Sequence, residues 1–97
     1  MREYELMYIA RPGLEPEQYE ALQNRVAELV ASNGGEATGL DVWGKRRLAY
    51  SIKHENDGFY VLFTFKGEEE LTRELDRVLS ITDEFLRFKI FRIDHRK

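Results

Sequence analysis

The sequence contains no cysteine among its 97 residues, and this absence removes several kinds of chemistry at once. Disulfide bridges, thiolate metal sites, iron–sulfur clusters and cysteine nucleophiles all need the missing thiol. Nothing in the chain therefore requires an oxidising compartment, and we expect a cytoplasmic protein.

Long hydrophobic runs are also missing. The longest apolar stretch, residues 59–65, is far shorter than the roughly 20 residues that a membrane-spanning helix needs. The first residues have a strand-like pattern and lack the basic and then apolar order of a leader peptide. We expect neither secretion nor a membrane segment.

Catalytic and metal-binding signatures are scarce as well. The histidines, His54 and His95, fall in an expected turn and near the C-terminus. The sequence has no nucleophile elbow, no phosphate-binding P-loop and no dinucleotide fingerprint. Glutamates such as residues 68–70 stand where a helix is expected to begin, which favours a solvated face. We expect no catalytic residues, no metal ion, no cofactor and no small-molecule substrate.

A strong excess of one charge sign is absent too, because the formal net charge is -3. That sum hides an alternation along the chain. Residues 12–40 and 66–84 each carry a net charge of -4, whereas residues 41–54 carry +3 and residues 87–97 carry +4. This alternation predicts acidic elements on one side of the molecule and basic elements on another.

The chain does contain enough apolar material, at 42% hydrophobic residues, for one core, and we expect a single domain over residues 1–97. Hydrophobic periodicity predicts strands over residues 2–10, 36–53, 59–65 and 85–93, with a turn at 54–58. It predicts helices over residues 16–32 and 68–80. This order indicates an α+β, ferredoxin-like split βαβ fold. Right-handed crossovers then place both helices on one face of a four-stranded antiparallel sheet.

The predicted strands divide their side chains between the two faces of the sheet. Leu86 is expected to face the helices together with Phe88 and Ile90. The face without helices should carry an apolar patch edged by Arg87 and Lys89. Since monomers seldom leave such a patch bare, a partner is the leading interpretation, with a homodimer or packing beneath the long hairpin as alternatives. The core expected beneath the helices is Leu6, Tyr8, Val26, Leu29, Val30, Phe63, Phe65, Leu75, Leu79, Phe88 and Ile90.

Some ferredoxin-like domains are acyl phosphate hydrolases, which cradle phosphate in the loop after the first strand. Arg11 stands in that place, but Pro12, Glu15 and Pro16 leave the loop short, acidic and poor in free amide donors. A phosphate-binding enzyme therefore stays an alternative, as does a regulatory module that binds a small molecule.

The RNA-recognition motif is a further rival, because residues 58–63 superficially resemble the signature of its third strand. That signature wants a basic residue where this chain has Asp57, and a stacking aromatic where it has Val61. Base stacking on the sheet is therefore not expected.

Residues 43–53, WGKRRLAYSIK, are the most informative segment. They resemble the signature of the family of the sixth protein of the bacterial small ribosomal subunit, and the resemblance extends over nearly the whole chain. Ser51 stands where that family usually has proline, and on an edge strand serine restores a backbone donor without contradicting the resemblance. Further matching features are Arg2, Tyr4 and Glu5, Arg11 and Pro12, Gly34 and Gly35, residues 58–60 and residues 86–88.

The resemblance implies a non-enzymatic constituent of the small ribosomal subunit. Such a protein pairs with the eighteenth small-subunit protein and binds the central domain of 16S ribosomal RNA, near the fifteenth. We expect the eighteenth protein to dock at Met7, Ile9, Tyr60, Leu62 and Phe91. Contacts to RNA phosphate and sugar, and not to base edges, are expected from Arg2, Lys45, Arg46, Arg47, Lys53, Arg87, Lys89 and Arg92.

Overall fold

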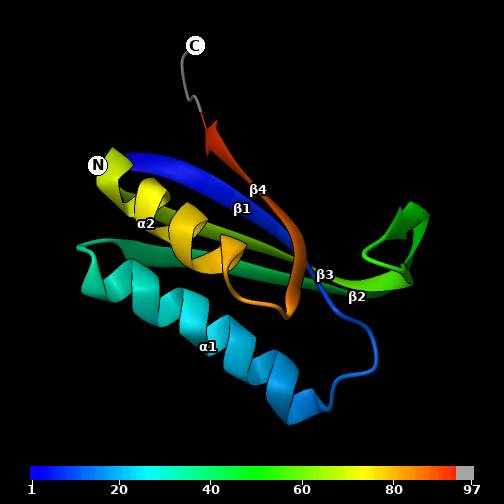
Figure 1. Cartoon of the computed structure of the whole chain (residues 1–97). Coiled ribbons are helices and arrows are strands. Elements are labelled where there is room, and N and C mark those ends of the chain that lie inside the picture. Colours follow the sequence, from blue (N-terminus) through cyan, green and yellow to red (C-terminus); the bar gives the residue numbers. More distant parts are fainter. Residues whose placement is uncertain (94–97) are drawn as a thin grey trace.

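The computed structural model describes residues 1–93. The elements follow in the order β1 (Arg2–Ala10), α1 (Pro16–Ser32), β2 (Glu36–Ile52), β3 (Glu55–Gly67), α2 (Glu69–Ser80) and β4 (Phe85–Ile93). The four strands form one antiparallel sheet in the order β2-β3-β1-β4, and both helices cover the same face (Figure 1). The predicted ferredoxin-like fold is confirmed, and β2 is an edge strand as expected.

Local interactions fix the start of α1 at the predicted proline. The side-chain oxygen of Gln18 accepts a hydrogen bond of 2.8 Å from the backbone N–H of Glu15, the residue before Pro16. The hydroxyl of Tyr19 donates to the Arg11 carbonyl at 2.7 Å. The first bond satisfies a backbone N–H that the start of a helix leaves without a partner, and the second ties the helix to the residue that follows β1.

The core lies between the helices and the sheet. Most of the predicted core residues are buried in it, whereas Leu29, Phe88 and Ile90 are partly buried and pack against it. Tyr8, at its centre, is 1% exposed, and its hydroxyl has no hydrogen-bond partner among the described residues. Burial raises the pKa of the Tyr8 hydroxyl far above its ordinary value, because the charged form would lose its hydration. The apolar contacts of the ring therefore outweigh the cost of an unsatisfied hydroxyl.

The turn between β2 and β3 differs from the prediction. It is formed by Lys53 and His54, whose φ angles of 50 and 69° lie in the left-handed region, and Ile52 pairs with Glu55 across it. The predicted turn over residues 54–58 was wrong, because residues 55–58 continue β3. A two-residue turn with positive φ at both positions matches the twist of the flanking strands, which explains why the hairpin closes so tightly.

The face predicted for Leu86 was also wrong. Ile9 pairs with Arg87 and Ala10 with Phe85, so Leu86 is an extra residue in a β-bulge. It is 5% exposed and packs with Ile9 on the face opposite the helices. Strict alternation failed here because a bulge reverses which residues share a face.

Candidate functional site

The sheet face opposite the helices, called the open face below, carries the predicted apolar patch. Strand pairing places Met7 between Leu62 of β3 and Lys89 of β4. Phe91 is 46% exposed, and its ring lies 5.6 Å from the Lys89 ammonium. Met7 and Leu62 are partly buried. The structure therefore brings these side chains together on one surface.

Part of the open face is covered by the chain itself. Ile9, Leu48 and Leu86 form a second buried cluster, with Tyr60 packed against it. Leu48 comes from β2, which extends past the sheet and bends back toward β4. Gly58 permits this approach, because a Cβ there would collide with the Ile9 side chain. Ile9, expected to meet a partner, is only 9% exposed and is packed beneath the hairpin.

Trp43 belongs to the family motif, but the sequence did not indicate it as a site residue. A bulge between Val42 and Gly44 leaves it unpaired in β2. Its indole is 40% exposed and stacks on the Tyr60 ring, with centroids 6.4 Å apart and planes 8° from parallel. The indole N–H donates to Asp41 Oδ2 at 3.1 Å. The open face thus has an oriented aromatic pair beside its apolar patch.

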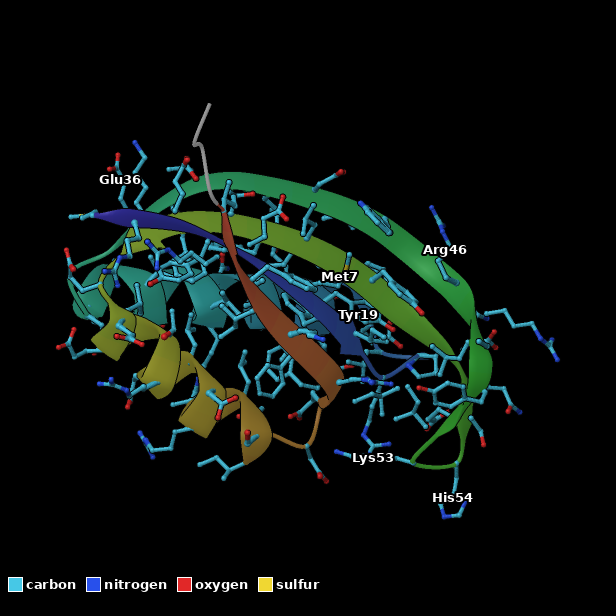
Figure 2. The ribbon with its side chains drawn as sticks, turned by 90° about the horizontal axis from the view of Figure 1, so that it is seen from above. Met7, Tyr19, Glu36, Arg46, Lys53 and His54 are labelled. Carbon is cyan, nitrogen blue, oxygen red and sulfur yellow. The ribbon has the colours of Figure 1, made fainter. Side chains whose placement is uncertain are left out.

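The basic residues of the informative segment cluster at the end of the β2–β3 hairpin. Lys45, Arg46, Arg47 and Lys53 are all exposed. Figure 2 shows Arg46 projecting outward from the bend of β2, and Lys53 beside His54 at the turn. Within residues 1–93, none of these four cations forms an ion pair with a carboxylate. Their charge is free to meet an anionic partner.

Arg2 and Arg92 lie apart from this cluster. Arg92 pairs with Tyr4, whose ring is packed beneath the helices, and Arg2 precedes Tyr4 by two residues in β1. Both arginines are therefore on the helix side of the sheet. They line an open hollow together with Glu69 and Asp76 of α2. The expected separation of acidic and basic sides therefore holds for the hairpin but not for these two arginines. The cause is β-strand alternation, which sends Arg92 to the face opposite Lys89.

The charges of α2 are largely paired within the helix. Arg77 Nη2 lies 2.7 Å from Glu74 Oε2, and this hydrogen bond lowers the pKa of the Glu74 carboxyl. Arg73 lies 3.8 Å from Glu69. Arg73 and Arg77 thus differ from the hairpin cations, which have no such internal partners.

Arg87 of β4 connects the open face to the hairpin. Its Nη1 donates a hydrogen bond of 2.6 Å to the hydroxyl of Tyr50, in the distal part of β2. The strands β2 and β4 are the two edges of the sheet, yet the bend of the hairpin brings these residues into contact. The sequence indicated Tyr50 only as part of the motif, since a contact between opposite edges cannot be read from strand order.

The arginine that could have held a phosphate is engaged elsewhere. Arg11 Nε donates to the Asp83 carbonyl at 3.1 Å, and Nη1 lies 3.4 Å from Glu55 Oε2. Arg11 therefore holds the β1–α1 loop against two other segments.

Among the described residues, no cluster of acidic and histidine side chains is arranged to hold a metal ion. No helix in residues 1–93 is long and apolar enough to cross a bilayer.

Comparison with known proteins agrees with the resemblance seen in residues 43–53. The family of ribosomal protein S6 matches residues 3–92. A small ribosomal subunit protein bS6 from Symbiobacterium thermophilum is 53% identical over 92 residues, covering 95% of this chain and 97% of the relative. A protein of the same name from Caldanaerobacter subterraneus is 46% identical over 94 residues, covering 97% of this chain and 99% of the relative.

Solved structures lead to the same family. The crystal structure of 30S ribosomal protein S6 from Thermotoga maritima matches with a TM-score of 0.89 and 31% identity, covering 95% of this chain and 87% of that one. The C-terminal domain of MgtC from Mycobacterium tuberculosis matches with a TM-score of 0.65 but 12% identity, so it shares the fold alone. The relatives in this family are ribosomal proteins and not enzymes. Since the family match spans nearly all of the sequence and the relatives share about half of their residues with it, the chain belongs to the ribosomal protein S6 family of the small ribosomal subunit.

Proposed function

We propose that this chain binds the central domain of 16S ribosomal RNA with its β2–β3 hairpin and pairs with the eighteenth small-subunit protein through its open face, near the fifteenth. The observation that carries the proposal is the hairpin itself. It presents Lys45, Arg46, Arg47 and Lys53 without carboxylate partners among the described residues. Next to it lies the part of the open face around Met7, Leu62 and Phe91, which is outside the cluster that the hairpin buries.

The RNA contacts follow from the chemistry of these cations. Exposed lysine and arginine side chains favour phosphate and sugar, because a folded RNA presents its backbone more readily than its base edges. Arg87 and Lys89 extend the basic surface onto the open face. Arg2 and Arg92 would touch the same RNA only where it passes the helix side of the sheet, so their contribution should be smaller.

The proposed docking of the eighteenth protein uses the apolar patch. Met7, Tyr60, Leu62 and Phe91 share one surface, while Ile9 supports it from beneath the hairpin. Aromatic and aliphatic side chains at the centre of an interface usually supply most of its affinity. With a net charge of -3, the isolated chain should bind RNA weakly, so the partner should strengthen RNA binding.

A salt series tests the RNA contacts. The two-protein complex is titrated with a central-domain RNA fragment, using the wild type and a variant with Arg46→Ala and Arg47→Ala. We expect weaker binding and a salt slope reduced by about 1 for each phosphate that the variant no longer binds. The matched control combines Arg73→Ala and Arg77→Ala on α2, which removes the same charge from paired helix positions. An unchanged affinity and slope for the hairpin variant would remove this segment from the RNA interface.

A second experiment tests the partner surface. Leu62→Asp places a charge on the open face and should abolish pairing with the eighteenth protein, while circular dichroism shows a folded monomer. Ile81→Asp is the control, because Ile81 is 73% exposed just after α2. Unfolding of the Leu62 variant, or normal pairing by it, would contradict the assigned face.

A further inference from the structure

The contact between Tyr50 and Arg87 leaves most of an aromatic ring in solvent. Tyr50 is 62% exposed although its hydroxyl accepts the hydrogen bond from Arg87. The bond anchors the far end of the ring, which limits the orientations the side chain can take. An exposed ring whose orientations are limited in this way has already lost part of the entropy that stacking on it would cost.

Attachment of the hairpin does not require this ring. Leu48 already holds the hairpin to the sheet through its buried contacts with Ile9 and Leu86. A hydrogen bond between two exposed side chains adds little stability by comparison, because water competes for both groups. The exposed ring is thus available for another role.

The surroundings of the pair are basic. Arg87 uses one N–H group for Tyr50 and keeps its other guanidinium donors, and within residues 1–93 no carboxylate pairs with it. Lys89 follows two residues later on the same face of β4. Arg46 and Lys53 belong to the same hairpin segment as Tyr50. A ligand that fits here combines a flat ring with negative charge.

We propose that Tyr50 and Arg87 form a stacking site for one unpaired nucleotide of the RNA, with the base on the Tyr50 ring and the adjacent phosphate on the free N–H groups of Arg87. This site rests on the proposed binding of RNA by the hairpin and adds a base contact to the backbone contacts expected there. Aromatic rings stack with any base, and guanidinium groups bind phosphate through directed hydrogen bonds. An acidic segment of a protein would use the charge but not the open ring face.

The experiment compares Tyr50→Ala, Tyr50→Leu and Tyr50→Phe in the two-protein complex bound to the central-domain RNA fragment. Removal of the ring in the first two variants should weaken binding roughly 5- to 150-fold, the range of one base–aromatic stack. Tyr50→Phe keeps the ring and should weaken binding much less. The salt slope should stay at the wild-type value in all three, because no phosphate contact is removed, whereas Arg46→Ala should lower it.

Ultraviolet crosslinking of the wild-type complex, followed by mass spectrometry, should attach a nucleotide to the peptide that contains Tyr50. Wild-type affinity of the Tyr50→Ala complex for the RNA would overturn the proposal. Equally weakened RNA binding by Tyr50→Phe and Tyr50→Ala would also overturn it, because the hydroxyl that anchors Arg87 would then matter and the ring would not. Weaker pairing of Tyr50→Ala with the eighteenth protein in the absence of RNA would assign the ring to the protein interface instead. If the wild-type complex itself fails to bind the fragment, the proposed function fails and the stacking site with it.

Discussion

The two faces of the sheet are built from the same strands but are covered in different ways. On one face, both helices bury a continuous core in which Leu6, Val61 and Phe65 are fully inaccessible. On the open face, one bent hairpin buries a small cluster around Ile9, and the rest stays in contact with solvent. In an amphipathic sheet the helix-covered face supplies most of the burial that stabilises the fold. The other face is then free to carry a binding surface.

The aromatic residues show the same contrast. Beneath the helices the Tyr4 ring stacks on Phe65 at 5.4 Å, and Tyr8 meets Phe85 edge-on at 5.0 Å. On the open face, Trp43 stacks on Tyr60 but keeps 40% of its surface exposed. Similar ring contacts thus pack the core beneath the helices and leave an aromatic side chain accessible to solvent on the open face.

The largest difference between the faces should appear on truncating Phe65. Phe65→Ala removes a ring that is 0% exposed, so it should lower the free energy of unfolding by about 3 to 5 kcal/mol. Leu62→Ala on the open face, where the side chain is partly buried, should cost about 1 kcal/mol. Urea unfolding of both variants measures the contrast. Equal costs would show that the open face contributes to stability as much as the core does.

Leu48→Ala should give an intermediate and local effect. The side chain is 8% exposed in the small cluster with Ile9, so its removal should cost about 2 kcal/mol. Because this cluster attaches the hairpin, hydrogen exchange should accelerate at the amides of residues 46–58 and stay slow in β1. Uniform acceleration throughout the sheet would show that the two faces unfold as one unit.

The smallest effect is expected for the hydroxyl buried among the core residues. Tyr8→Phe removes a hydroxyl without a partner among the described residues, so it should leave stability unchanged or raise it by up to about 1 kcal/mol at neutral pH. The raised pKa of Tyr8 means that the folded state favours the protonated form. The preference for the protonated form has its full effect on the free energy of unfolding below the ordinary tyrosine pKa of about 10. The effect is lost as the pH rises above that value, because the unfolded chain then releases the proton more readily.

The wild type should therefore lose stability more steeply than Tyr8→Phe above pH about 10, by up to about 1.4 kcal/mol for each pH unit. Parallel stability curves for the two proteins between neutral and strongly alkaline pH would contradict the burial of the hydroxyl.

Much of this architecture could be predicted from the sequence because the signals are local. Period-2 alternation in β1 separates Leu6 and Tyr8 from Met7, and Glu15 before Pro16 marks the start of α1. The predicted core residues lie in the core or pack against it, and both helices cover one face of the sheet as predicted (Figure 1). The motif in residues 43–53 indicated the family that the comparisons show.

The errors occurred where pairing between strands determines the structure. The bulge in β4 moved Leu86 to the open face. The tight turn at Lys53 and His54 lets β3 begin at Glu55, four residues before the predicted strand over residues 59–65. The predicted basic surface was divided for a different reason, because simple alternation along β4 places Arg92 and Lys89 on opposite faces. A bulge or a turn type depends on how two strands twist together, which one strand's pattern does not specify.

Three features follow from the sequence alone: the order of the elements, the apolar stripes that face the core and the family motif. Each depends on residues close together in the chain. Three others arise only when the chain folds: the hairpin bends over the open face, Leu48 covers Ile9, and Tyr50 meets Arg87. Tyr50 and Arg87 stand on opposite edges of the sheet. Their contact arises from the accumulated twist and bending of paired strands, a property of the whole sheet that no single segment encodes.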